Sequence, residues 1–422
     1  MAPHDTSTVM MKQPNHDPKI KLYVPEEDVG DPEVTILIPA MDEELTIGTF
    51  LEWCREGIAN AGCRAEILIV DSSTDRTPEI ANTMGANVLK TPARGLGRAY
   101  IDAIPYVRGR YVVMGDADCT YDFREIAPFI EKLRQGYDFV MGSRFKGSIE
   151  PGAMPPLHRY FGTPVTTFIL NLIFGSHFSD IHSGMRAITR DALERMDLQS
   201  QSWEYAAEMI LKSVHMKLKT TEVPINFFKD PEGRQSHMKR GGWLEPWKAG
   251  WQNLRAMFTY GVDFFLFKPG LALLAAGLSL MLPLTFGPFS LGPINFSINW
   301  MLLAMAVALV GLSFTFFGGV AQLLFDYTGT LRRRWEQVFP YNRTVVLSLA
   351  LIVAGFALTL PLIYKYLANS FRLPAGLGVE TYQAVTGLWL IVAGFEAFTF
   401  MLLIRAIMVT VAQKAERDEH RN

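Results

Sequence analysis

The stretch Tyr-Val-Val-Met-Gly-Asp-Ala-Asp at residues 111–118 decides how this chain is interpreted. It begins with an apolar run of the kind that forms a strand buried on both faces of a parallel sheet. Two carboxylates, Asp116 and Asp118, follow that run directly. Mg²⁺ and Mn²⁺ prefer oxygen ligands, and Mg²⁺ is usually held by one or two carboxylates together with substrate phosphates. The stretch therefore predicts a site for Mg²⁺ or Mn²⁺ bound against a diphosphate.

Similar apolar runs and helical patterns alternate on both sides of this stretch. The other predicted strands are Val34–Ile38, Ile67–Val70 and Phe139–Met141. The predicted helices are Leu45–Ala59, Thr77–Met84, Leu96–Tyr106 and Glu125–Gln135. This alternation predicts a doubly wound α/β domain, in which ligands bind at the carboxyl ends of the strands. Asp42, Glu43, Asp71 and Asp116 follow strand ends, so we expect them to meet in one crevice.

The second half of the chain is apolar, and no Asp, Glu, Lys or Arg occurs from Pro269 to Phe325. Each of its apolar segments approaches or exceeds the length of about 20 residues that crosses a bilayer. These segments are Pro269–Pro288, Ile298–Phe325, Val345–Tyr364 and Val385–Ile404. Basic residues gather after the second and fourth segments, which predicts that the α/β domain and the C-terminus face the cytoplasm. We expect an integral membrane protein, with a bacterial inner membrane as its location.

Two stretches before the apolar half have the aromatic and basic character of helices that lie in the headgroup layer. They are Pro156–Phe174 and Trp243–Tyr260. The uncharged stretch Phe161–Phe178 is alternatively a membrane span, but glycine and proline interrupt it. We favour the surface interpretation, because a span there would separate Asp116 and Glu204 by a membrane.

Composition limits the possible partners and divides the chain. The net charge of -2 gives no argument for nucleic-acid binding. Three cysteines without a close pair indicate a reducing compartment. We expect a disordered tail at 1–31, a catalytic domain at 32–240, a second surface helix at 241–263, four transmembrane helices at 264–411 and a cytoplasmic tail at 412–422.

Three further motifs each have a functional and a structural interpretation. The turn Arg94–Ala99 contains two glycines and is either an anion site at a helix start or a plain turn. Arg144 follows the last strand and either clamps a phosphate or forms an ordinary salt bridge. The basic segment Lys229–Arg240 is a lid over an anionic ligand, a stretch attracted to anionic lipid, or both. Glu396 lies in the fourth apolar segment, where we favour a structural pairing with a neighbouring helix.

Taken together and in this order, these motifs resemble those of the family-2 glycosyltransferases. The likeness covers residues 34 to about 240, and the subgroup that it resembles is the polyprenyl-phosphate hexose synthases, such as dolichol-phosphate mannose synthase. The resemblance implies an α/β fold of the GT-A type, a Rossmann-like nucleotide-diphospho-sugar transferase domain, followed by an all-α domain of four transmembrane helices. It also implies an enzyme, a hexosyltransferase.

The resemblance implies roles for individual residues. The nucleotide sugar would be bound by Pro39, Ala40, Glu43, Asp71, Gly97, Asp116, Arg234, Ser236 and Lys239. The cation would be held by Asp116, Asp118 and Thr120, and the lipid phosphate by Arg144 and Arg159. The catalytic residues would be Asp116, Asp118, Arg144 and Glu204.

The implied reaction moves a hexose, with inversion, from a donor of the GDP-mannose or UDP-glucose type to undecaprenyl or dolichyl phosphate. The second pKa of a phosphate monoester is about 6, so the acceptor is already an anion and needs no strong base. Glu204 is the candidate if a base is required. The alternatives are a polysaccharide synthase that acts on a sugar hydroxyl, and a transporter or flippase with a nucleotide-sensing domain. A homo-oligomer is compatible with the sequence.

Overall fold

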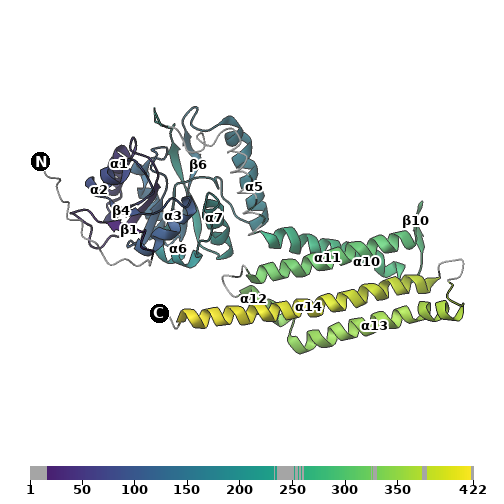
Figure 1. Ribbon diagram of the computed structural model, residues 1–422. Coiled ribbons are helices and arrows are strands. Elements are labelled where there is room, and N and C mark those ends of the chain that lie inside the picture. Colours follow the sequence, from purple (N-terminus) through teal and green to yellow (C-terminus); the bar gives the residue numbers. More distant parts are fainter. Residues whose placement is uncertain are drawn as a thin grey trace. The chain divides into compact units, whose positions relative to one another are not determined.

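The computed structural model describes residues 17–231, 233–234, 251, 255, 258, 261–324, 326, 330–372 and 378–419. The chain divides into two compact units, and the boundary follows Tyr260. The first unit carries a mixed sheet with helices, and the second is a bundle of long helices (Figure 1).

Eight strands of the first unit that the structure describes form one sheet. Their order across the sheet is β1 (Lys21–Tyr23), β4 (Asn87–Lys90), β3 (Ala65–Asp71), β2 (Val34–Ala40), β5 (Tyr111–Met114), β7 (Arg186–Thr189), β6 (Phe139–Ile149) and β8 (Thr220–Phe227). The four central strands β4, β3, β2 and β5 run parallel, whereas β1 and β7 run antiparallel to their neighbours. All four predicted strands are present, and β3, β2 and β5 therefore end at the same edge.

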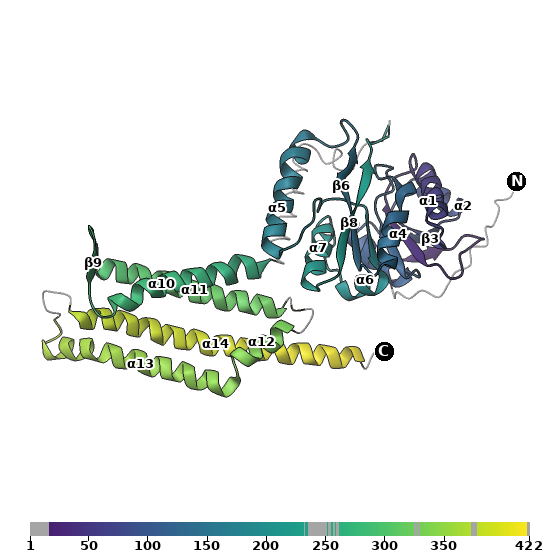
Figure 2. The same ribbon diagram turned by 180° about the vertical axis from the view of Figure 1, so that it is seen from behind.

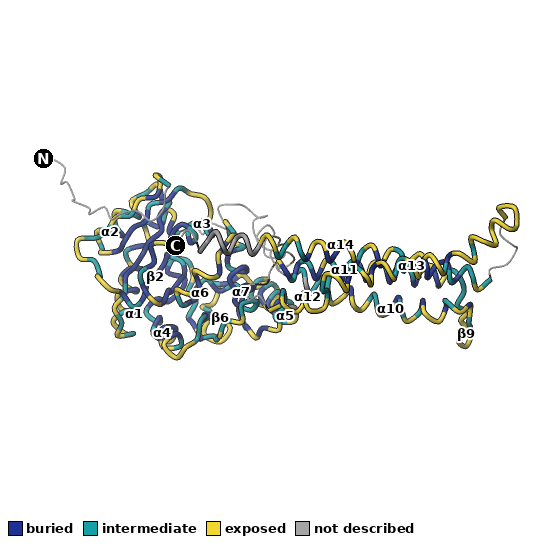
Figure 3. The backbone as a smooth tube through the Cα atoms, turned by 90° about the horizontal axis from the view of Figure 1, so that it is seen from below, coloured by how far each residue is buried: buried dark blue, intermediate teal, exposed yellow. Residues whose placement is uncertain are grey.

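Helices cover both faces of this sheet (Figures 1 and 2). One face packs against α1 (Ile47–Ala61), α2 (Thr77–Thr83) and α4 (Ala127–Arg134), and the other against α3 (Leu96–Ala103), α6 (Arg190–Met196) and α7 (Tyr205–His215). Within β2, Ile36 and Ile38 join the first core, Leu37 joins the second, and all three are fully buried. Figure 3 shows that the sheet strands form the buried part of this unit. The continuous apolar run in the sequence reflects this burial on both faces.

The second unit contains four helices that are long and apolar enough to cross a membrane, within the residues that the structure describes. They are α10 (Lys268–Leu284) with the turn before it, α11 (Ile298–Leu324), α13 (Tyr341–Ala368) and most of α14 (Val379–Glu419). They coincide with the four predicted segments. A hairpin of β9 (Phe289–Leu291) and β10 (Ile294–Phe296) joins α10 to α11.

Glycines allow these helices to approach closely. A Cβ at Gly277 of α10 would lie 2.5 Å from the backbone nitrogen of Ala308 on α11. A Cβ at Gly355 of α13 would lie 2.5 Å from the carbonyl oxygen of Gly387 on α14. Small residues at such seams give helices the close packing that replaces a hydrophobic driving force in lipid.

The structure differs from the predicted organisation, or adds to it, in three places. Residues 17–31 are not a disordered tail, because Lys21–Tyr23 pairs with β4 and Ile20 is fully buried. The stretch between the second and third apolar segments contains a helix, α12 (Thr330–Val338). Helix α14 continues through Glu419, so most of the expected tail at 412–422 is helical. The second surface helix, expected at 241–263, falls largely outside the described residues.

Candidate active site

The loops that follow β2 and β3 are joined by hydrogen bonds. The backbone N–H groups of Asp42 and Glu43 donate to Ser73 Oγ at 2.8 Å and Thr77 Oγ1 at 2.9 Å. Asp42 has a positive φ of 56° and accepts from the backbone N–H of Thr74 at 2.9 Å. These bonds fix the path of both loops at the edge where the two strands end.

Asp71 ends β3 and is fully buried. Its carboxylate forms an ion pair with Lys90 of β4 and accepts the backbone N–H of Ser73 at 3.2 Å. Lys90 Nζ also donates to the carbonyl oxygen of Ser73 at 2.6 Å. Ala40 lies opposite Asp71 in the register of β2 and β3, so the predicted nucleotide residues Pro39, Ala40 and Asp71 are brought together. The pairing of Asp71 with Lys90 was not predicted.

Asp116 and Asp118 follow β5 at the same edge of the sheet. One oxygen of Asp118 accepts from the backbone N–H of Thr120 at 3.0 Å and from its hydroxyl at 2.6 Å. Thr120 therefore orients the Asp118 carboxylate in the structure. No described residue donates a hydrogen bond to Asp116.

Arg234 reaches these acids from a segment that is far along the chain. Its guanidinium donates to both oxygens of Glu43, at 2.8 and 2.5 Å, and lies 3.4 Å from Asp118 Oδ2. It also donates to Asp230 at 2.8 Å, and its side chain is only 7% exposed. The structure thus joins three predicted site residues, Glu43, Asp118 and Arg234. Ser236 and Lys239 of the same predicted loop lie outside the described residues.

Burial and mutual repulsion disfavour negative charge on the Asp116–Asp118 pair. Burial, followed by the neighbouring Asp118 charge, raises the pKa of Asp116 to about 7. Burial also raises the pKa of Asp118, and the Arg234 charge opposes this rise. A bound cation would favour the ionised form of both carboxylates, as opposite charges generally do.

These residues fit a divalent ion bound together with substrate phosphates. The donor set consists of oxygen atoms, and Asp116 is unpartnered among the described residues. No group of three or more His, Cys, Asp or Glu side chains in the described part of the chain has the geometry to hold an ion alone. Mg²⁺ commonly takes one or two carboxylates and completes its shell with phosphate and water oxygens.

Arg144 on β6 forms a buried ion pair, as in the salt-bridge interpretation of this residue, and its partner Asp180 was not predicted. It donates to both oxygens of Asp180, at 2.7 and 2.8 Å, and its backbone N–H donates to the same carboxylate at 3.1 Å. Its guanidinium lies 5.1 Å from the ring centre of Phe227. Asp180 is fully buried, so it holds the arginine in one orientation. Charge-assisted pairs of this fork geometry are among the stronger hydrogen-bonded contacts.

The loop that contains Asp180 also borders Asp116. Gly184 donates its backbone N–H to Tyr121 Oη at 2.8 Å. A Cβ at Gly184 would lie 2.5 Å from Asp116 Oδ2 and 3.0 Å from the Tyr121 ring. The absence of a side chain at this position keeps the space beside the Asp116 carboxylate clear. Neither Asp180 nor Gly184 was among the predicted site residues.

The structure places the remaining predicted residues as follows. Gly97 lies in the first turn of α3 and packs on the loop before α7, where a Cβ would lie 2.2 Å from the carbonyl oxygen of Ser200. Arg159 lies over its neighbour Tyr160 and makes no ion pair with any described carboxylate. Glu204 precedes α7, and its Oε2 is buried without a hydrogen-bond partner in the described part. Roles for these three residues remain predictions.

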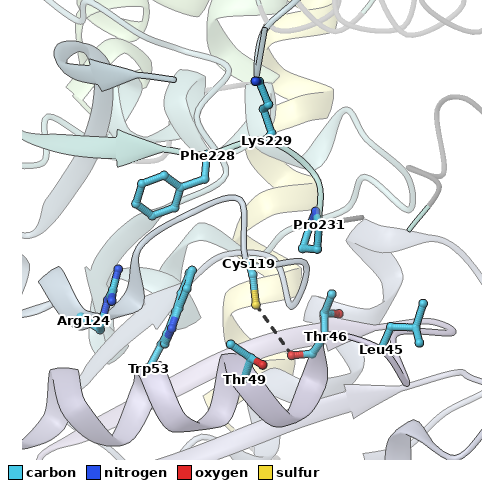
Figure 4. A pocket seen from close by; sticks show the side chains of 9 residues that line it. All are labelled: Leu45, Thr46, Thr49, Trp53, Cys119, Arg124, Phe228, Lys229 and Pro231. Carbon is cyan, nitrogen blue, oxygen red and sulfur yellow. Dashed lines mark hydrogen bonds between the residues drawn. The ribbon is translucent and has the colours of Figure 1, made fainter. Parts of the chain in front are cut away.

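A separate cavity of about 360 Å³ is lined in part by Cys119, the residue after Asp118 (Figure 4). Trp53 and Phe228 contribute aromatic walls, and the Arg124 guanidinium lies 4.5 Å from the Trp53 ring centre. Cys119 contacts the carbonyl oxygen of Thr46 across it. Asp116, Asp118 and Glu43 do not line this cavity, so it is a neighbour of the candidate site and not the site itself.

Comparison with known proteins identifies the family. Residues 35–197 match the model of Glycosyl transferase family 2, and residues 319–408 match that of the Glycosyltransferase family 2 C-terminal transmembrane region. The chain is 33% identical over 372 residues to the low-salt glycan biosynthesis hexosyltransferase Agl6 of Haloferax volcanii, covering 86% of this chain and 88% of that protein. The chain belongs to glycosyltransferase family 2.

Two other similarities cover about half of this family-2 glycosyltransferase. A dolichyl-phosphate hexose transferase of Haloferax volcanii is 31% identical over 195 residues, which are 46% of this chain and 82% of that protein. A glucosyl-3-phosphoglycerate synthase from Mycobacterium tuberculosis, solved with Mn²⁺ and uridine diphosphate, is 18% identical. It covers 54% of this chain and 80% of that one, with a TM-score of 0.42.

Family membership confirms the predicted fold class and enzyme class. The protein is a membrane glycosyltransferase with a GT-A domain and a transmembrane region. The alternative of a transporter with a sensing domain is not supported. The membrane's identity, the side that faces the cytoplasm, and the donor and acceptor remain predictions.

Proposed function

We propose that this glycosyltransferase moves a hexose from a nucleotide-diphosphate sugar to a polyprenyl phosphate at the cytoplasmic surface of a membrane. The observation that carries the proposal is an exposed apolar helix on the same unit as the acidic site. This helix, α5 (Thr163–Phe174), is 12 residues long and follows a single turn at His158–Gly162. The dolichyl-phosphate hexose transferase named above gives independent support.

The outer face of α5 and the turn before it exposes large apolar side chains. Tyr160 is 74% exposed, Phe161 63%, Phe168 66% and Leu172 61%. Contiguous apolar patches of this kind on soluble units mark contact with a membrane or a partner. Since the chain also has membrane-spanning helices, a lipid surface is the partner that this face fits.

The inner face of α5 is connected to the loop whose Asp180 pairs with Arg144 of β6. Thr166 Oγ1 lies 2.8 Å from His182 Nε2, and the His182 backbone N–H donates to Asp180 at 3.3 Å. Asp180 in turn holds the Arg144 guanidinium. A phosphate entering from the surface covered by α5 would therefore meet an arginine that is already oriented.

The proposed chemistry assigns different tasks to the acids and the arginines. A divalent ion bound at Asp116 and Asp118 would stabilise negative charge on the departing diphosphate. Glu43 and Asp71 lie at the strand ends where a nucleotide would bind. Arg144 would offset the repulsion between the acceptor phosphate and the donor diphosphate. A phosphate monoester is a sufficient nucleophile once it is ionised, with a second pKa of about 6.

The charges that flank the spans support the proposed orientation. Arginines at residues 332–334 and 343 lie between the second and third spans. Under the positive-inside rule, this connection and the catalytic unit face the cytoplasm, where nucleotide sugars would be supplied. The bacterial inner membrane remains an expectation, and the relatives named above come from Haloferax volcanii.

The experiment is a panel of nucleotide sugars offered to the purified full chain together with polyprenyl phosphate and Mg²⁺ or Mn²⁺. Label from the active donor is expected to enter the organic phase, with release of the nucleoside diphosphate. Water-soluble sugars serve as competing acceptors in parallel reactions. Transfer to those sugars at the same rate as to the polyprenyl phosphate would refute a lipid-phosphate acceptor.

One observation favours the alternative of transfer to a sugar hydroxyl. Such a reaction needs a general base, and the buried Oε2 of Glu204 has no hydrogen-bond partner among the described residues. Under the alternative, Glu204→Gln would abolish transfer. Under the proposed function, this variant keeps measurable transfer to polyprenyl phosphate, since that acceptor needs no base.

A further inference from the structure

Helix α12 is a short amphipathic helix between the second and third spans, and one aromatic side chain anchors it. The Trp335 ring packs on Phe267, Phe339 and Phe400, with centroid distances of 5.7, 5.6 and 5.3 Å. Trp335 Nε1 donates to Gln322 Oε1 of α11 at 3.1 Å. The helix is therefore fixed against the bundle by packing and not only by its connections.

One arginine of α12 is used within the fold. Asp326 is 3% exposed and accepts the backbone N–H of Arg332 at 2.7 Å. Arg332 Nη2 also donates to the Asp326 carbonyl oxygen at 2.9 Å. These bonds hold the start of the helix, where backbone N–H groups lack partners of their own. Arg332 is thus turned toward the protein.

The next two arginines have no such partner. Arg333 and Arg334 are exposed, and neither forms an ion pair with a carboxylate in the described part of the chain. Arg343, in the first turn of α13, is exposed and unpaired within the same limits. The nearby acid Glu336 is paired with Arg405 of α14 at 3.0 Å. Three guanidinium groups at one end of the bundle are therefore not neutralised by described residues.

The position of these arginines indicates their partner. Helix α11 ends at Leu324 and α13 begins at Tyr341, and both are long enough to span a bilayer. The segment between them must then lie near the lipid headgroups. Val338 is 60% exposed and Tyr341 47% exposed, so apolar side chains accompany the arginines as in surface-bound amphipathic helices.

We propose that Arg333, Arg334 and Arg343 form a binding surface for the phosphates of anionic diacyl phospholipids. Guanidinium groups match phosphate oxygens with paired N–H donors and remain charged at any physiological pH. The three side chains are exposed on two helices, which fits several headgroups in a leaflet better than one enclosed ligand. This surface is distinct from the acidic site and from Arg144, and it requires no transfer activity.

The test measures lipid binding to the purified full chain in detergent by native mass spectrometry. The probes are phosphatidylglycerol, phosphatidylcholine, a polyprenyl monophosphate and inorganic phosphate. The wild-type chain is expected to bind phosphatidylglycerol more tightly than phosphatidylcholine. Each basic residue near an anionic surface contributes about 1 kcal/mol, which corresponds to about fivefold in affinity.

Matched variants locate the surface. Arg334→Gln is expected to weaken phosphatidylglycerol binding about fivefold, and the double change at Arg333 and Arg334 about 30-fold. Arg372→Gln removes the same charge from an exposed position after α13, at the opposite end of that helix, and is expected to leave binding unchanged. A double change to lysine should retain most binding, and circular dichroism shows whether each variant is folded.

Four outcomes would overturn the proposal. They are equal loss of binding in Arg334→Gln and Arg372→Gln, equal affinity for phosphatidylglycerol and phosphatidylcholine, binding of inorganic phosphate as tight as that of phosphatidylglycerol, and a preference for the polyprenyl monophosphate that the double variant abolishes. The last result would make this surface part of acceptor binding. Failure of lipid binding would leave the proposed transfer reaction unaffected, since that reaction is measured separately.

Discussion

Replacement of Arg234 by glutamine should strengthen the binding of Mn²⁺ when no nucleotide is present. In the structure the Arg234 guanidinium bonds both oxygens of Glu43 and lies 3.4 Å from Asp118 Oδ2. A positive side chain thus contacts the acidic cluster that is proposed to receive the cation. An ion that binds without nucleotide must share these carboxylates with the arginine or displace it.

The size of the effect follows from the contacts that would be lost. Hydrogen bonds to charged groups contribute about 1.5–3 kcal/mol to stability. If the ion must break the Arg234 contacts to enter, its dissociation constant in the wild-type protein is about 10- to 150-fold higher than in Arg234→Gln. Exposed ion pairs have much smaller effects, but the Arg234 side chain is only 7% exposed.

Electron paramagnetic resonance of free Mn²⁺ measures this binding directly, with no turnover required. Titrations of the full chain with and without a nucleoside diphosphate would be compared for the wild type, Arg234→Gln and Arg195→Gln. Arg195 pairs with Asp191 at 2.9 Å on the surface and its side chain is 53% exposed, so it controls for the loss of one charge. Only Arg234→Gln should bind Mn²⁺ more tightly.

When a nucleoside diphosphate is bound, we expect the wild type to bind Mn²⁺ more tightly than Arg234→Gln does. A bound diphosphate brings negative charge that Arg234 can contact instead of Glu43, so the arginine then assists binding. If Arg234→Gln bound Mn²⁺ with unchanged or weaker affinity in the absence of nucleotide, the guanidinium would not be a competitor of the ion, and the assignment of the cation to this cluster would lose its support.

Four further predictions address the site. Asp118→Ala should abolish transfer of label to the organic phase and EDTA should reproduce the loss, whereas full activity in excess EDTA would exclude a metal role. Arg144→Ala should raise the KM for polyprenyl phosphate more than the KM for the nucleotide sugar, and an unchanged lipid KM would remove it from the acceptor site. Gly184→Ala should lower kcat about 100-fold with the fold intact by circular dichroism, because its Cβ would lie 2.5 Å from Asp116 Oδ2 and displace that carboxylate. Burial and the Arg144 charge lower the pKa of His182 to about 4. Between pH about 6.5 and 4 the unfolded chain therefore binds one more proton than the folded chain, and the free energy of unfolding should fall by about 3 kcal/mol as the pH drops through this range. Thermal melts across this pH range should show the loss of stability in the wild type and not in His182→Asn.

The central strands and the four spans could be predicted because their patterns are local. Residues 111–114 are apolar because helices cover both faces of the sheet. Apolar segments of about 20 residues are typical of helices that span a membrane. Strands β1, β4, β7 and β8 were not predicted. Of these, β1 and β8 form the two edges of the sheet, where burial leaves a weaker pattern. Helix α12 was not predicted because three arginines dominate its sequence, and it is stabilised by contacts with distant residues, among them the packing of Trp335 on Phe267 and Phe400.

Some residues of the candidate site could likewise be predicted from a local pattern, and others could not. Asp116 and Asp118 could be identified from the chain alone, because a strand end followed by two carboxylates is a local signal. The partners of the basic residues could not be identified. Asp180 is 36 residues from Arg144, and Glu43 is 191 residues from Arg234. Such pairs depend on which loops the fold brings together, and a single sequence does not contain that information.

These two pairs also imply that the two arginines act differently. Breaking a buried ion pair leaves an uncompensated charge, so each arginine needs a carboxylate until a ligand arrives. The partner of Arg144, Asp180, is fully buried behind it and belongs to no proposed ligand contact, so Arg144 can remain in place when a phosphate binds. Arg234 pairs with Asp230 and also with two acids of the site itself, Glu43 and Asp118, so it must exchange these two acids when donor and cation bind. We therefore expect substitutions at Arg144 to alter acceptor affinity more than donor affinity, and substitutions at Arg234 to weaken the coupling between cation binding and nucleotide binding.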